Sequence, residues 1–202
     1  MHYLLWALIG YVAGCINGSQ IIGKIKGVDI KNSGVKNAGA SNTAILLGWK
    51  FGIIVGIIDI LKAVVPIVIL HQIGGENKEI LMYLTGLFVI FGHNYPVNMK
   101  FKGGKGTASL IGLLFALDWK IGLISFGLLV VTALLTDYLV IGVLVMYLSF
   151  ITMTVLFDYG WIPVIIAIGL TVLSILKHLE NYRRIKNKTE TKVSSMFKKK
   201  KK

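Results

Sequence analysis

Long apolar runs separated by short polar stretches dominate the chain. The runs cover residues 4–23, 51–71, 80–97, 106–117, 121–136, 139–157 and 161–177. They show no alternation of apolar and polar residues as in membrane barrels, and a lipid environment requires backbone groups to be paired within each segment. The pattern therefore predicts an all-α, polytopic membrane protein with seven transmembrane helices. The fourth run is short, so runs four and five also fit a re-entrant hairpin that leaves their outer ends on the same sides.

Composition agrees with a lipid environment. Hydrophobic residues make up 55% of the 202 residues and charged residues 15%, with a mean hydropathy of +0.74. Soluble domains usually carry about 25% charged residues. We expect one transmembrane domain over residues 1–190 and a basic cytoplasmic tail over residues 191–202. No Lys or Arg precedes the first run, so we expect a retained span and not a signal peptide.

The distribution of charge indicates sidedness. The net charge is +13, and the basic residues lie in short loops between apolar runs, which favours a membrane protein over one that binds nucleic acid. With the N-terminus outside, the inner loops and the tail hold 19 Lys and Arg residues, whereas the outer loops hold Lys78 and Lys120. We therefore predict an outside N-terminus and a cytoplasmic C-terminus in a multi-pass plasma membrane protein. The run Lys198–Lys202 is expected to adhere to anionic lipid.

The first of three polar stretches on the predicted inner face spans residues 31–43 and is rich in small residues. Glycine lets backbone N–H groups approach a ligand, and Asn37, Ser41 and Asn42 add side-chain hydrogen bonds. Ser41 is expected to cap a helix that continues through Leu46, and a helix N-terminus suits a phosphate. Taken alone, the stretch is explained more simply by an ordinary capped loop.

The second stretch, residues 92–107, contains a lysine framed by glycines. Lys105 stands between Gly103-Gly104 and Gly106, ahead of an apolar run. The spacing is not that of a Walker A loop, and a basic surface loop is the alternative. The glycines slightly favour phosphate binding over that alternative.

The third stretch follows the seventh run. His178 and Asn181 are three residues apart, so on a helix they share a face. An interfacial histidine is the more common role for such a residue. Within the second run, Asp59 and Lys62 are also three apart and are expected to form a structural ion pair. The four histidines are too scattered to indicate a metal site, so we expect no metal and no cofactor. No Gly-x-Ser-x-Gly, His-Glu-x-x-His or Ser/His/Asp set is present.

Together these stretches resemble the bacterial acyl-phosphate-dependent glycerol-3-phosphate acyltransferases, from about Gly14 to Glu190. Residues 92–96 (Gly-His-Asn-Tyr-Pro) with residues 101–106 resemble the second motif of the family. His178, Glu180 and Asn181, continuing to Arg184 and Glu190, resemble the third. The resemblance implies transfer of a fatty acyl group from acyl phosphate to the 1-hydroxyl of glycerol 3-phosphate. The products are lysophosphatidic acid and phosphate, at the first step of phospholipid synthesis.

The resemblance also implies roles for single residues. Asn37, Gly39, Ser41 and Asn42 bind acyl phosphate. Lys105, His178 and Asn181 bind glycerol 3-phosphate and are the catalytic residues. The implied partners are the two substrates, membrane lipid and the soluble enzyme that makes acyl phosphate. An activated donor needs no strong protein nucleophile, and one of its phosphate oxygens is a candidate for the acceptor of the hydroxyl proton.

The chain departs from the family pattern within the first motif and just after it. Val35 replaces the usual serine, and Ile45 replaces an arginine that contacts the acceptor. Residues 137–140 (Asp-Tyr-Leu-Val) replace Arg-Tyr-Val-Ser. Two alternatives therefore stay open: a diverged paralogue with another phosphorylated acceptor or reduced activity, and a transporter of an anionic solute. Polar residues gathered at one face favour an enzyme over a transporter.

Overall fold

The structure, a computed structural model, describes residues 2–197. This range consists of helices and their connections, with no strand within it, which confirms the all-α prediction there. The chain divides into two compact units, Met1–Trp119 and Lys120–Lys202. The first unit contains α1 (His2–Cys15), α2 (Gly18–Lys26), α3 (Ala40–Leu47), α4 (Trp49–Ile73), α5 (Lys78–Asn94), the short 3₁₀ helix η1 (Val97–Met99) and α6 (Thr107–Leu117). The second contains α7 (Trp119–Thr136), α8 (Leu139–Leu156), α9 (Trp161–Lys186) and α10 (Val193–Phe197).

Among the described residues, six helical segments are long and apolar enough to cross a membrane. They are His2–Lys26, Trp49–Ile73, Lys78–Met99, Trp119–Thr136, Leu139–Leu156 and Trp161–Lys186. These segments match six of the seven predicted runs. The fourth run forms α6, whose 11 residues rise only about 16 Å, against roughly 30 Å of hydrocarbon. The count of seven spans and the direction of the termini therefore stay predictions.

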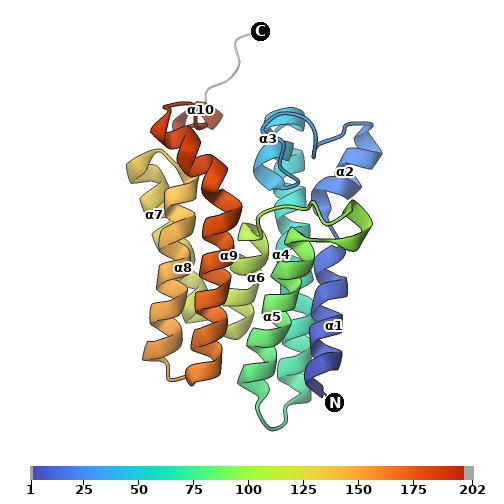
Figure 1. The fold of residues 1–202 in the computed structure, drawn as a ribbon, viewed down its shortest axis with the longest axis vertical. Helices are drawn as coiled ribbons and strands as arrows, with labels where there is room; N and C mark the ends of the chain where they lie inside the picture. The colour runs from blue at the N-terminus through green and yellow to red at the C-terminus, as the bar shows by residue number, and fades with distance from the viewer. Residues whose placement is uncertain (1, 198–202) are drawn as a thin grey trace. The chain divides into compact units, whose positions relative to one another are not determined.

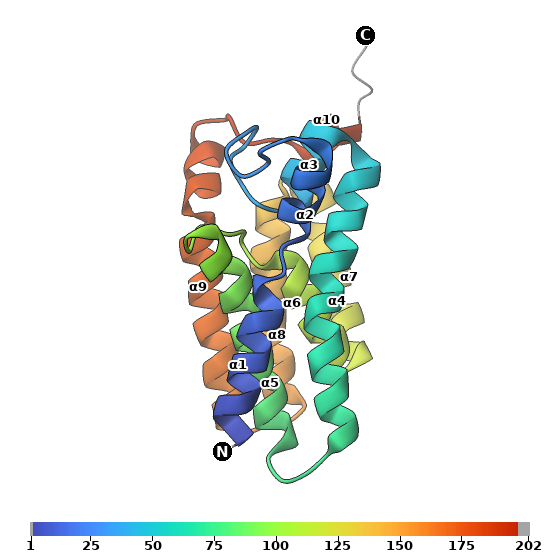
Figure 2. The same ribbon diagram turned by 90° about the vertical axis from the view of Figure 1, so that its right-hand side faces the viewer.

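Close helix contacts build the first unit. α1 runs beside α5 in both views (Figures 1 and 2). A β-carbon on Gly14 would overlap Val89 O, and one on Gly92 would overlap Tyr11 O, so glycine at both positions permits this approach. α4 packs against α3, α5 and α6. Figure 1 shows α2 and α3 at the end of this unit away from its N-terminus, and Lys31 Nζ donates to Met99 O at 3.0 Å, so the predicted inner loops 24–50 and 98–105 are in contact.

The second unit brings the 137–138 turn and the beginning of the tail together. Asp137 accepts hydrogen bonds from Ser194 N at 2.7 Å and from Ser194 Oγ at 2.8 Å. α8 packs against α9, and the buried hydroxyls of Ser125 and Ser149 join α7 to α8 at 3.0 Å. The two segments predicted to lie inside thus share one end of this unit as well. The run Lys198–Lys202 lies outside the described residues.

Two predictions about helix boundaries were wrong. The first run is not one continuous helix, because α1 ends at Cys15 and α2 begins at Gly18, where Asn17 accepts a hydrogen bond from Gln20 N at 3.0 Å and caps the second helix. Ser41 does not cap α3. That helix begins at Ala40 with Gly39 as its N-cap, and Ser41 is already inside it.

Candidate active site

The loop between α2 and α3 is held together by the Asn42 side chain. Its Nδ2 lies 2.7 Å from Ile30 O, 2.9 Å from Ser33 O and 3.0 Å from Asn37 O, and its Oδ1 accepts from Val35 N at 3.0 Å. The residue is fully buried. An amide that spans the loop in this way fixes its shape, so the contacts of Asn42 are those of a residue that organises the loop.

The other predicted acyl-phosphate ligands lie where this loop enters α3. Asn37 and Ser41 are partly exposed and Gly39 is buried. Gly39 O accepts from Thr43 N and from Thr43 Oγ1, both at 3.0 Å. The first N–H groups of α3 precede the helical hydrogen-bond ladder, which is the usual position for an anion at a helix terminus. Asn37, Gly39 and Ser41 therefore surround one helix N-terminus.

The loop that carries Lys105 folds back on the end of α5. Gly103 N donates to Asn94 O and Gly104 N donates to His93 O, both at 3.1 Å. Gly106 has a φ of +82°, a left-handed conformation that favours glycine, and it precedes α6 as its N-cap. Lys105 is partly exposed between these two fixed points.

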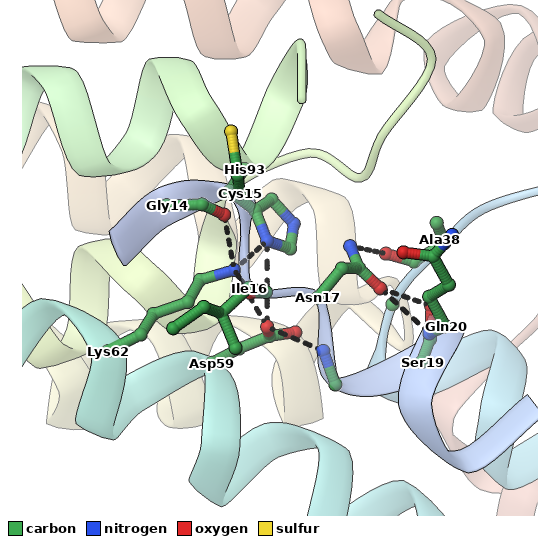
Figure 3. Close-up of polar contacts among 12 residues, drawn as sticks. Gly14, Cys15, Ile16, Asn17, Ser19, Gln20, Ala38, Asp59, Lys62 and His93 are labelled. Carbon is green, nitrogen blue, oxygen red and sulfur yellow. Dashed lines mark hydrogen bonds and ion pairs between the residues drawn. The ribbon is translucent and has the colours of Figure 1, made fainter. Parts of the chain in front are cut away.

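A buried polar cluster lies beneath these loops (Figure 3). Lys62 Nζ is 2.9 Å from Asp59 Oδ1 and 2.7 Å from His93 Nδ1, so the two α4 residues form the ion pair that their spacing indicated, with His93 added from α5. The exposed fractions of Asp59, Lys62 and His93 are 1%, 6% and 3%. Lys62 Nζ also reaches Gly14 O at 3.1 Å and Ile16 O at 2.6 Å, at the end of α1.

The second unit positions the third motif near the end of α9. His178 is buried, and its Nδ1 lies 2.9 Å from Ser174 O. A backbone carbonyl only accepts, so Nδ1 donates here and the neutral ring carries its acceptor at Nε2. Asn181 Nδ2 donates to Glu190 Oε1 at 2.7 Å, and Arg184 Nε donates to Glu190 Oε2 at 2.6 Å. Glu190 therefore holds Asn181 and Arg184 in fixed positions.

A separate cavity of about 610 Å³ lies in the first unit between α2, the loop after it and the η1 segment. Lys24, Lys31 and Lys100 are among its lining residues, and none of the predicted ligands is. The Asn32 side chain donates to Asp29 Oδ2 at 2.7 Å and lowers the pKa of this carboxyl below its usual value. The cavity is thus lined by the first part of the loop between α2 and α3, away from the predicted ligands at the end of that loop.

Comparison with known proteins identifies the family. The sequence profile described as "Glycerol-3-phosphate acyltransferase" matches residues 4–188. The chain belongs to this glycerol-3-phosphate acyltransferase family. It is therefore an acyltransferase of phospholipid synthesis and an integral, multi-pass membrane protein.

Relatives of this acyltransferase match over nearly their full length. "Glycerol-3-phosphate acyltransferase 1" of Oceanobacillus iheyensis is 56% identical over 99% of both chains. "Glycerol-3-phosphate acyltransferase 2" of Thermotoga maritima is 38% identical over 96% of this chain and 98% of its own. A crystal structure of PlsY (YgiH), an integral membrane glycerol 3-phosphate acyltransferase in its glycerol 3-phosphate form, is 31% identical. It superimposes with a TM-score of 0.89 over 98% of this chain and 100% of the other.

The sequence did not indicate two residues that hold elements of this acyltransferase in place, His93 and Asn17. His93 stood out only as part of a motif, because its partner Lys62 is 31 residues earlier in the chain. Asn17 was hidden in an apolar run, although an Asn three residues before a Gln in an otherwise apolar stretch is a cap signal. The structure describes the six predicted site residues at positions 37–62 and Lys105 in the first unit, and His178 and Asn181 in the second.

Proposed function

We propose that this protein transfers a fatty acyl group from acyl phosphate to the 1-hydroxyl of glycerol 3-phosphate. A bond forms between the hydroxyl oxygen and the acyl carbon, and the bond from that carbon to the phosphate oxygen breaks. Lysophosphatidic acid and inorganic phosphate are the products. The observation that carries the proposal is the likeness to the PlsY structure in its glycerol 3-phosphate form, at 31% identity over 98% of the chain. A second PlsY structure, in the lysophosphatidic acid form, matches with a TM-score of 0.86.

The donor site in this proposal is the entrance of α3. The phosphate of the acyl phosphate binds the N-terminal N–H groups of the helix, with Gly39 giving backbone access. Asn37 and Ser41 donate from their side chains. Asn42 contributes chiefly by holding the loop, because its amide already makes four hydrogen bonds there.

Charge neutralisation is the role of Lys105 in this proposal. Its ammonium faces phosphate oxygens on which negative charge increases as the carbon–oxygen bond to phosphate breaks. A cation fixed in place before the reaction stabilises this charge more than it stabilises the ground state. The hydrogen bonds of Gly103 and Gly104 to the end of α5 supply such a fixed position.

Acceptor binding is the role of His178 and Asn181. In the neutral ring, Nε2 accepts a hydrogen bond from the 2-hydroxyl of glycerol 3-phosphate, because Nδ1 donates to Ser174 O, and the proton of the reacting 1-hydroxyl stays available to the phosphate. Asn181 is oriented by Glu190 and donates to the acceptor with its second amide hydrogen. In our proposal the leaving phosphate takes the hydroxyl proton, so His178 orients the acceptor and is not the base.

The proposal includes the membrane arrangement. Residues 1–190 form one catalytic domain with seven spans and an outside N-terminus, and residues 191–202 form a basic tail at the cytoplasmic surface. A soluble enzyme that makes acyl phosphate supplies the donor. The basic loops attract both anionic substrates.

The test is an assay of the purified full-length protein with acyl phosphate and glycerol 3-phosphate. Stoichiometric release of phosphate and lysophosphatidic acid supports the proposal. Release only with another phosphorylated alcohol indicates a diverged paralogue, and solute flux into vesicles without acyl transfer indicates a transporter. Either of the last two results overturns the proposal.

The same assay on His178→Ala separates the two sources of a base. We expect a rise in KM for glycerol 3-phosphate with measurable kcat remaining, because the donor phosphate still accepts the proton. Complete loss of turnover with substrate binding intact identifies His178 as the base and contradicts this part of the proposal.

A further inference from the structure

The break between α1 and α2 exposes two helix ends of opposite partial charge. Lys62 and Asp59 bind these two ends. The C-terminal end of a helix carries a partial negative charge and unpaired carbonyls, and the N-terminal end carries the opposite. Lys62 Nζ binds Gly14 O and Ile16 O at the end of α1. Asp59 Oδ1 faces Gly18 N, at the start of α2, at 3.4 Å. The ion pair thus matches both ends of the broken helix.

His93 connects this ion pair to the end of α5. Its Nδ1 lies 2.7 Å from Lys62 Nζ and 3.6 Å from Asp59 Oδ1. A lysine ammonium only donates, so Nδ1 accepts from Lys62 and the neutral ring carries its hydrogen at Nε2. The position of the ring is therefore set by a buried cation that is itself bound by two carbonyls.

The other edge of the His93 ring touches the loop that carries Lys105. A β-carbon on Gly104 would overlap His93 Nε2 and would lie 2.6 Å from Ala38 O, so Gly104 is enclosed between the ring and the loop before α3. His93 O also accepts from Gly104 N at 3.1 Å. Both the ring and the backbone of His93 therefore hold the residue directly before Lys105.

We propose that His93 is a positioning residue for the acyl transfer, resting on the function proposed above. Lys62 and Asp59 fix the imidazole, and the imidazole holds Gly104 against Ala38. This contact sets the position of Lys105 relative to the Asn37–Gly39 segment. The buried cluster sets the geometry of two phosphate-binding loops in addition to joining α1, α4 and α5. A displacement of about 1 Å at such a site costs on the order of 100-fold in rate.

His93→Asn separates positioning from stability. The asparagine Oδ1 replaces Nδ1 as an acceptor for Lys62, so the thermal unfolding midpoint is expected to stay close to that of the wild type. The ring beside Gly104 is lost, and kcat is expected to fall by roughly 10- to 100-fold. KM for either substrate is expected to change little, because the displaced ammonium of Lys105 still attracts phosphate. It no longer lies where negative charge increases on the leaving phosphate in the transition state, so the loss is in kcat.

Gly104→Ala changes the other partner of the contact between His93 and Gly104. Its methyl group overlaps Nε2 and displaces the loop, so kcat is expected to fall by a similar factor. The double variant should be no worse than the worse single variant, because both changes displace one loop. Thr85→Val is the matched control: it removes a buried hydroxyl of α5 that binds only Leu81 O at 2.8 Å among the contacts described. Its kcat is expected to be unchanged.

The outcomes separate this inference from the function on which it rests. If the wild type itself does not transfer acyl groups, the proposed function fails, and the positioning role that rests on it fails with it. If the wild type is active and His93→Asn retains full kcat, the positioning role is wrong. It is also wrong if kcat per folded molecule is preserved and only the unfolding midpoint falls, or if the losses of the two single variants multiply in the double variant.

Discussion

At the scale of single residues, the contacts of Asn42 show how one amide can shape a phosphate loop. Its side chain joins carbonyls at positions 30, 33 and 37 to the backbone N–H of Val35. A hydroxyl makes fewer bonds and has a shorter reach, so an amide is suited to this position. The residue type alone predicted a polar contact there, but only the fold decides whether the contact is to a ligand or to the loop.

Ile45 offers a gain-of-function test at the same scale. Ser41 and Ile45 are one helical turn apart on α3, so they share a face, and Ile45 is 39% exposed. By the resemblance to the family, an arginine at position 45 contacts the acceptor, and its planar fork binds a phosphate at two points. We expect Ile45→Arg to lower KM for glycerol 3-phosphate by roughly tenfold, since a hydrogen bond to a charged group contributes about 1.5–3 kcal/mol.

The control for this change is Ile45→Lys, which adds the charge without the planar fork. Steady-state kinetics with varied glycerol 3-phosphate should show a smaller gain for lysine than for arginine. An unchanged KM in both variants would mean that position 45 does not reach the acceptor.

At the scale of elements, the interruption of the first span matters most. Hydropathy alone predicts one continuous helix over residues 4–23, whereas the structure ends α1 at Cys15 and starts α2 at Gly18. The interruption directs the chain into the 27–39 loop and places carbonyls of α1 within reach of Lys62. Backbone groups left unpaired by a break within an apolar segment require such partners.

Lys62→Met tests the link between this interruption and the ion pair. The substitution leaves the Asp59 carboxylate buried without its ammonium and removes the donor to two carbonyls. We expect it to lower the free energy of unfolding by about 3–5 kcal/mol. Asp59→Asn combined with Lys62→Met should be less destabilised than Lys62→Met alone, because no uncompensated charge remains.

Thermal unfolding in detergent, followed by tryptophan fluorescence, measures the difference. A double variant that is as unstable as the sum of the two single variants would show that the residues contribute independently. In that case the interaction between Asp59 and Lys62 does not contribute to the free energy of unfolding.

The sequence predicts most of the helices but few of the contacts between them. Apolar runs located six helical segments of spanning length among the described residues, because the cost of polar groups in lipid makes this signal strong. The spacing of Asp59 and Lys62 predicted their pairing. The contacts of His93 with Lys62 and Gly104 were not predictable, because they join positions 31 and 11 residues apart through the packing of separate segments. The start of α3 was missed because Gly39, without a capping side chain, precedes the helix.

At the scale of the whole molecule, the distribution of Lys and Arg predicts which ends of the helices face the cytoplasm. Within the first unit, segments 24–50 and 98–105 are in contact through Lys31 Nζ and Met99 O, and within the second unit Asp137 binds Ser194 at the start of the tail. Each unit is thus internally consistent with the predicted sidedness. Helix α6, with its 11 residues, is the element on which the number of spans depends.

Labelling of single cysteines decides between seven spans and a re-entrant hairpin. In a Cys15→Ser background, Lys120→Cys introduces an exposed thiol between α6 and the body of α7. With seven spans and an outside N-terminus, an impermeant maleimide added to intact cells should label it as readily as Glu76→Cys, on another predicted outer turn. Lys102→Cys, in the predicted inner loop, should react only after the membrane is permeabilised. A hairpin would protect Lys120→Cys from the external reagent while Glu76→Cys still reacts, because the 118–120 turn would then end within the hydrocarbon. External labelling of Lys102→Cys with protection of Glu76→Cys would instead reverse the orientation, and the excess of positive charge would face outward.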